Sequence, residues 1–97
     1  MQAATAAFLR HLERERNASP HTIRAYAEDL AQLTEQLRRE LGREPRPEDV
    51  DHLALRGFLA ELHRRGLAKS SSARKLAGLR TFFRYLCREG RLQANPA

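Results

Sequence analysis

The sequence predicts an all-α protein with four helices. Apolar residues recur at three- or four-residue steps in four segments, residues suited to cap helices flank these segments, and no segment has the two-residue alternation of a half-buried strand. With 97 residues, the chain is near the lower end of the size at which one core closes without disulfides or metals. We therefore expect a single domain over residues 1–97.

The first helix is predicted over residues 3–16, where Ala, Phe and Leu residues share one side and charged residues occupy the other. The second is predicted over residues 20–41. Ser19 suits its N-cap, Pro20 suits the first helical position because proline lacks the donor that this position leaves unpaired, and Gly42 suits a left-handed end. The apolar stripe of the second helix consists of Ile23, Tyr26, Ala27, Leu30, Leu33, Leu37 and Leu41.

The next segment, GREPRPEDV, is predicted to be a loop. Its two prolines are one residue apart, and such a pair does not fit inside an α-helix. Asp51 is placed to cap a third helix over residues 52–65, which closes at Gly66. The residues expected to face inward from this helix are Leu55, Phe58, Leu59 and Leu62.

A fourth helix is predicted over residues 71–90. The serines at 70 to 72 suit the start of this helix. Phe82 and Phe83 are predicted to lie mostly in the core, although Phe82, at the edge of the apolar stripe, could support a partner surface. Tyr85 lies away from the stripe, facing solvent or a missing neighbour. The stripe itself consists of Leu76, Leu79, Phe83 and Leu86.

Charge is distributed unevenly along the chain. Residues 1–62 hold nine Lys or Arg and eleven Asp or Glu, whereas residues 63–97 hold nine Lys or Arg and a single acid, Glu89. In the fourth helix the basic residues gather beside or opposite the apolar stripe, and such a row can follow a phosphate backbone. The sequence therefore indicates an anionic partner, nucleic acid before membrane. The basic residues of the row are Arg74, Arg80, Arg84, Arg88 and Arg91.

Residues able to bind metals or form disulfides are sparse. Cys87 has no second cysteine to pair with and is predicted to be a packing residue of an intracellular protein. The four histidines fall on different segments without metal-ligand spacing, and no apolar run is long enough to cross a bilayer. We therefore expect no metal, no cofactor, no membrane partner and a cytoplasmic location.

Three segments together resemble the N-terminal core-binding domain of tyrosine recombinases, the phage-integrase family, and most nearly its Xer branch. The segments are FLRHLERERNASPHTIRAYAEDL at 8–30, PEDVDHLALRGFLAELHRRGL at 47–67 and SSSARKLAGLRTFFRYLCREGRLQANPA at 70–97. The resemblance implies an orthogonal four-helix bundle of the SAM-like type. It also implies that the second and fourth helices enter the major groove of a recombination half-site, while a C-terminal catalytic domain grips the other face of the duplex.

The resemblance further implies roles for individual residues. The nucleophilic tyrosine of the family belongs to the C-terminal domain, which this chain lacks, and neither Tyr26 nor Tyr85 matches it, so we expect no catalysis here. Expected partners are double-stranded DNA and other recombinase protomers, in DNA integration or chromosome dimer resolution. The residues implied to face DNA are His21, Thr22, Arg24 and Ala25 on the second helix, and Lys69, Ser70, Ser71, Ser72, Arg74, Lys75 and Arg80 on the fourth.

The features of single residues leave two other functions open. A helix-turn-helix regulator that works alone would need a short turn between two compact helices, which the long second helix disfavours. A helical protein-interaction module could use the basic row to meet an acidic protein. Binding to duplex DNA that weakens with salt distinguishes the DNA-binding functions from the protein-interaction module.

Overall fold

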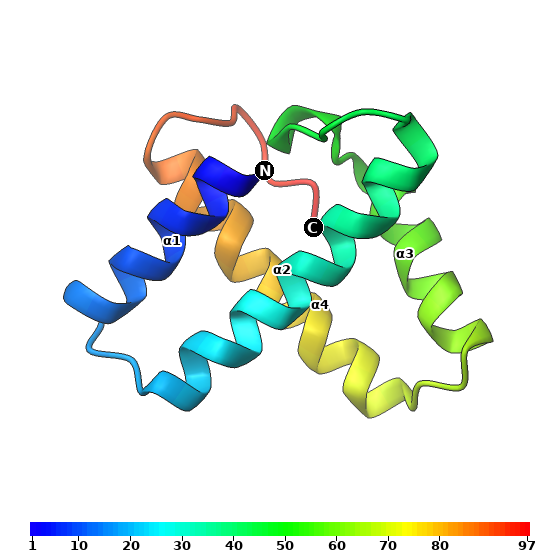
Figure 1. Cartoon of the computed structure of the whole chain (residues 1–97), viewed down its shortest axis with the longest axis horizontal. Helices are drawn as coiled ribbons and strands as arrows, with labels where there is room; N and C mark the ends of the chain where they lie inside the picture. Colours follow the sequence, from blue (N-terminus) through cyan, green and yellow to red (C-terminus); the bar gives the residue numbers. More distant parts are fainter. The chain divides into compact units, whose positions relative to one another are not determined.

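The computed structural model describes all residues from 1 to 97 and contains α-helices but no strand, as the sequence predicts (Figure 1). The helices are α1 (Gln2–Arg14), α2 (Pro20–Leu41), α3 (His52–Arg64) and α4 (Lys69–Arg88), with a short 3-10 helix η1 (Pro47–Asp49) before α3. The chain divides into two compact units, Met1–Pro45 with α1 and α2, and Arg46–Ala97 with η1, α3 and α4. That both units form one core-binding domain stays a prediction. None of the helices combines the length and the apolar character that crossing a bilayer requires.

The ends of α2 follow from local chemistry and confirm the predicted bounds. The Ser19 hydroxyl accepts a hydrogen bond from the backbone N–H of Thr22 at 3.1 Å, and Pro20 occupies the first turn of the helix. Gly42 ends the helix with a φ of 71°, and its N–H donates to the carbonyl of Arg38 at 2.9 Å. Glycine adopts this left-handed conformation without the steric cost that a Cβ would bring.

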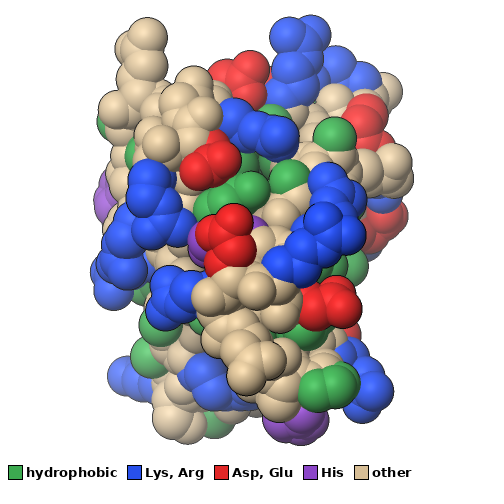
Figure 2. Space-filling model, turned by 90° about the vertical axis from the view of Figure 1, so that its left-hand side faces the viewer, with side chains coloured by type: hydrophobic (Ala, Val, Ile, Leu, Met, Phe, Trp, Pro, Cys, Tyr) green, Lys and Arg blue, Asp and Glu red, His purple; other side chains and the backbone are tan.

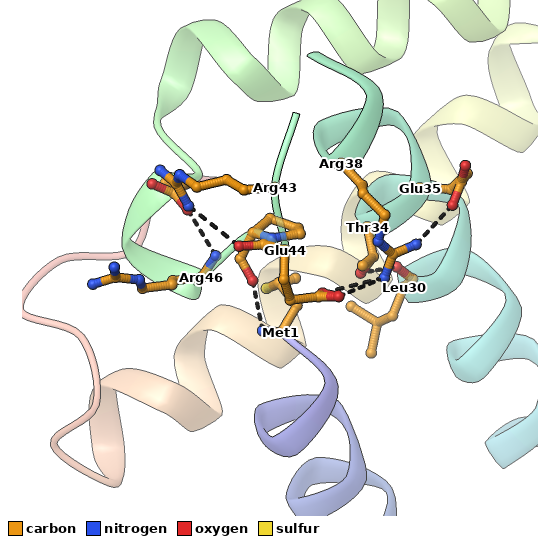
Figure 3. Close-up of polar contacts among 10 residues, drawn as sticks. Met1, Leu30, Thr34, Glu35, Arg38, Arg43, Glu44 and Arg46 are labelled. Atoms are coloured by element: carbon orange, nitrogen blue, oxygen red, sulfur yellow. Dashed lines mark hydrogen bonds and ion pairs between the residues drawn. The ribbon is translucent and has the colours of Figure 1, made fainter. Parts of the chain in front are cut away.

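The first unit packs α1 against α2 through apolar side chains. The ring of Phe8 meets that of Tyr26 edge to face, with centroids 5.3 Å apart, so Tyr26 has the packing role that its place on the apolar stripe predicts. The segment after α2 returns to the start of α1, where the Met1 amino group donates to the carbonyl of Pro45 at 2.8 Å (Figure 3). Leu41 differs from its predicted place in the stripe, since it is 41% exposed on the last turn. The buried residues of α1 and α2 include Ala4, Phe8, Leu12, Leu30, Leu33 and Leu37.

The second unit starts within the predicted loop, and its first residues include the single 3-10 turn η1. Pro47 fits there because it occupies the first turn of η1, where a backbone N–H would have no partner within the helix. Asp51 caps α3 as predicted, accepting a hydrogen bond from the N–H of Ala54 at 2.7 Å. After α3 the chain turns at Gly66, whose φ is 94°.

Helix α4 starts two residues earlier than predicted and is buried over a wider arc. Its N-cap is Ala68, which offers no side-chain hydrogen bond, so the prediction that serines open the helix is wrong. Phe82 is fully buried, in agreement with a place mostly in the core, whereas Tyr85 is 7% exposed, which corrects its expected place in solvent. The physical reason is that α4 buries residues on both sides of the predicted stripe. The ring of Phe82 packs against that of Phe83, with the ring centroids 5.0 Å apart.

Candidate nucleic-acid interface

One side of α4 is exposed and strongly basic. Successive residues of an α-helix are rotated by about 100°, so the eight exposed residues of α4 share an arc of roughly 140° that faces away from Leu79. We call this arc the basic face of α4. Its residues are the basic Lys69, Arg74, Arg80, Arg84 and Arg88 together with Ser70, Ala73 and Ala77.

Three predicted site residues of α4 lie toward the buried side instead. Ser71 and Lys75 are half-buried, and Ser72 is only 5% exposed. The Ser72 hydroxyl has no hydrogen-bond partner in this environment. The expectation that Ser72 lies on an accessible surface is therefore not met, because its helical position places it about 20° from that of the fully buried Leu79.

Replacing Ser72 by alanine is expected to stabilise the protein by roughly 1 kcal/mol. The substitution removes a buried hydroxyl that forms no hydrogen bond, and alanine has the higher helix propensity. Urea unfolding followed by circular dichroism measures the change. Ser70→Ala is the matched control, since Ser70 is exposed in the same turn. A loss of stability in Ser72→Ala larger than in the control would show that the hydroxyl is bonded after all.

The start of α2 presents the other group of predicted residues. His21, Thr22 and Arg24 are exposed there, while Ala25 is half-buried. The hydroxyl of Ser19 donates to that of Thr22 at 3.0 Å, so the two side chains form one small polar cluster at the helix start. Glu28 is exposed one turn after Arg24, which limits the surface favourable to an anion to the first turns of α2.

Ion pairs neutralise arginines of α2 and at the end of α3. Arg38 bonds the carboxylates of Glu44 and Glu35, each at 2.7 Å (Figure 3), and these hydrogen bonds raise the pKa of its guanidinium. At the end of α3, Arg64 and Arg65 both bond Glu61. The hydrogen bond from Arg64 is the main cause that lowers the pKa of Glu61, so this carboxylate stays ionised and offsets their charge.

On the basic face of α4, by contrast, Lys69, Arg74 and Arg84 contact no carboxylate. The excess charge of residues 63–97 is therefore concentrated on α4. On the face shown in Figure 2, basic side chains are interspersed with acidic ones.

The starts of α2 and α4 add to the attraction for anions. Neither helix has an acidic residue in its first turn, and no side chain caps α4. The first N–H groups of a helix have no partner within it and carry the positive end of the helix dipole. At both helix starts, backbone N–H groups can therefore donate hydrogen bonds to the oxygens of a phosphate group.

A groove of about 530 Å³ lies between α1 and α2 and is a poor candidate for a catalytic site. Its walls are largely apolar, and its two charged lining residues, Glu35 and Arg38, bond each other. No group of three or more His, Cys, Asp or Glu side chains is arranged to hold a metal ion anywhere in the chain.

Comparison with known proteins connects these surfaces to a family. Residues 5–90 match the family model described as "Phage integrase, N-terminal SAM-like domain". The chain belongs to this family. The match covers both α2 and α4 and confirms the resemblance found in the three sequence segments, as well as the SAM-like fold class.

Several curated relatives of this phage-integrase domain are tyrosine recombinases. The chain is 50% identical over 91 residues to the "Tyrosine recombinase XerC" of Pelobacter propionicus, covering 94% of this chain and 30% of that protein. It is 44% identical over 97 residues to that of Azotobacter vinelandii, covering 100% of this chain and 32% of that protein. The chain thus spans about a third of the length of these relatives, and no solved structure matches it.

The phage-integrase match corresponds to the N-terminal domain of these recombinases, whose catalytic domain lies outside the stretch that the chain covers. Arg84 was not among the residues implied by the sequence resemblance, although it belongs to the same exposed face as Arg74 and Arg80. The four-residue step from Arg80 to Arg84 was the signal that could have included it.

Proposed function

We propose that this chain binds double-stranded DNA in a sequence-specific manner, as the N-terminal domain of a site-specific tyrosine recombinase of the Xer type. The observation that carries the proposal is the basic face of α4, on which Lys69, Arg74 and Arg84 contact no carboxylate. Membership of the phage-integrase family supports it, as do relatives named tyrosine recombinases.

In this function α4 lies in the major groove with its basic face against the duplex. Arginine binds both phosphates and the O6 and N7 atoms of guanine, so Arg74 and Arg80 can contribute to affinity and to base reading. The exposed start of α2, with His21, Thr22 and Arg24, adds phosphate contacts that fix the register. Ser72 has no part in this surface, and Ser71 and Lys75 reach it only from the half-buried side.

The chain supplies affinity for a recombination half-site and takes no part in strand cleavage, which belongs to the catalytic domain. Its partners are the duplex and the other protomers of a recombination complex, and it needs no metal or cofactor for binding. DNA integration and the resolution of chromosome dimers, both in the cytoplasm, are the processes in which such a domain serves.

Fluorescence anisotropy with a labelled mixed-sequence duplex tests this function. We expect a dissociation constant in the micromolar range near physiological salt. For each tenfold rise in salt concentration, the base-ten logarithm of the binding constant is expected to fall by about 0.9 multiplied by the number of phosphates contacted. Selection from a randomised duplex pool is expected to enrich one half-site motif. Absence of binding at low salt would refute DNA binding, and equal binding to polyglutamate would favour the protein-interaction module.

A further inference from the structure

The segment after α4 folds back onto the middle of that helix. The Nε of Arg80 donates to the backbone oxygen of Ala97, the last residue of the sequence, at 3.1 Å, and the side-chain amide of Asn95 donates to the backbone carbonyl of Arg80 at 3.4 Å. Asn95 also accepts from the N–H of Ala97 at 2.9 Å, which closes a small ring of bonds. Residues 95–97 are therefore hydrogen-bonded to both the side chain and the backbone of Arg80.

These bonds use only one edge of the Arg80 guanidinium. The group has five N–H donors in a rigid plane, and the four on its two Nη atoms are not used by residues 95–97. Arg80 remains exposed and lies on the basic face of α4. Its Nη edge is therefore available to a phosphate while its Nε edge holds residues 95–97.

From this geometry we propose that residues 95–97 are a clamp that orients Arg80 for DNA, so that the segment leaving α4 and the grip on the duplex are coupled. The inference rests on the proposed function and adds a regulatory contact to the same surface. A free arginine side chain loses rotamer freedom when it binds, and a side chain already held by its Nε loses less. The clamp thus strengthens DNA binding through Arg80 rather than by touching DNA itself.

The coupling acts in both directions. If the clamped state of Arg80 binds a phosphate more tightly, then the phosphate must stabilise the clamped state by the same factor. Duplex binding is therefore expected to make residues 95–97 more ordered.

A double-mutant cycle on duplex affinity tests the clamp. Asn95→Ala removes both amide bonds of the clamp and is expected to weaken duplex binding about threefold, because Arg80 is then free to rotate. In an Arg80→Ala background, the same change is expected to have no further effect. In an Arg84→Ala background, its full effect is expected to persist, since Arg84 has no bond to residues 95–97. An equal loss in both backgrounds, or tighter binding by Asn95→Ala, would overturn the clamp.

A second measurement needs no DNA and keeps the two proposals separable. Amide ¹⁵N relaxation in the free chain, with an amidated carboxyl end, reports the order of Ala97. Arg80→Ala and Asn95→Ala are expected to increase the motion of this amide, and Arg84→Ala is expected to leave it unchanged. If the wild type bound no duplex but showed this pattern, the proposed function and the coupling to DNA would fail, while the bonds between Arg80 and residues 95–97 would stand. If Ala97 moved equally in all variants, the clamp itself would be refuted.

Discussion

Replacing Leu79 by alanine is expected to lower the free energy of unfolding by about 2–5 kcal/mol, which is a large fraction of the stability of a small domain. Leu79 is fully buried on α4, where Phe83 and Leu86 on the same side are fully buried as well. Alanine would lose the transfer free energy of the removed carbons and leave a cavity, because the surrounding large side chains relax only in part. Helix propensity contributes little to the change, since leucine and alanine are both strong helix formers.

Leu53→Ala is the matched control for this substitution. Leu53 lies in the first turn of α3 and is 72% exposed, so the same chemical change should alter stability by no more than about 0.5 kcal/mol. Urea unfolding followed by circular dichroism at 222 nm compares the two variants. Similar losses from both leucines would contradict the assignment of Leu79 to the core.

The parts of the fold that the sequence predicted are those governed by local chemistry. Ser19 and Pro20 start α2 and Gly42 ends it at the predicted residues, because a cap, a missing N–H and a left-handed φ act within one turn. Asp51 starts α3 for the same reason. These signals act within a few residues and do not depend on the rest of the chain.

The start and burial of α4 could not be predicted in this way. A row of serines is a usual sign of a cap, yet Ala68 holds the N-cap, and Ser70 lies within the first turn. The width of the buried arc depends on the side chains that pack around the helix, so the burial of Ser72 and Tyr85 is a tertiary effect that the four-residue stripe does not contain.

The candidate site was predictable in outline and less so in detail. Uneven charge and motif order indicated α4 and the start of α2, and the exposed Arg74 and Arg80 agree with that surface. The half-buried Lys75 shows that charge alone does not decide which side chains reach a ligand. The bond from Arg80 to Ala97 joins residues 17 apart and depends on how the chain turns after α4, which no motif encodes.

Arg74→Ala is expected to weaken duplex binding about tenfold and to leave the helical fold intact. Arg74 is exposed on the basic face of α4 and contacts no carboxylate, so its removal costs the protein no internal bond. If Arg74 contacts a base edge, the loss is expected to be greatest for the half-site selected from the randomised pool. If it contacts a phosphate, all duplexes should be weakened alike, and the salt slope should fall by about one.

Arg56→Ala on α3 is the matched control, because Arg56 is also exposed, also contacts no carboxylate, and carries the same charge. Long-range electrostatics alone would make the two variants lose similar affinity at low salt, and this shared loss would fade as salt screens the charges. A direct contact by Arg74 would instead leave a difference between the variants at physiological salt. Anisotropy titrations at a low and at a physiological salt concentration separate these cases. Equal affinities of the two variants at physiological salt would show that neither Arg74 nor the basic face of α4 belongs to the DNA interface.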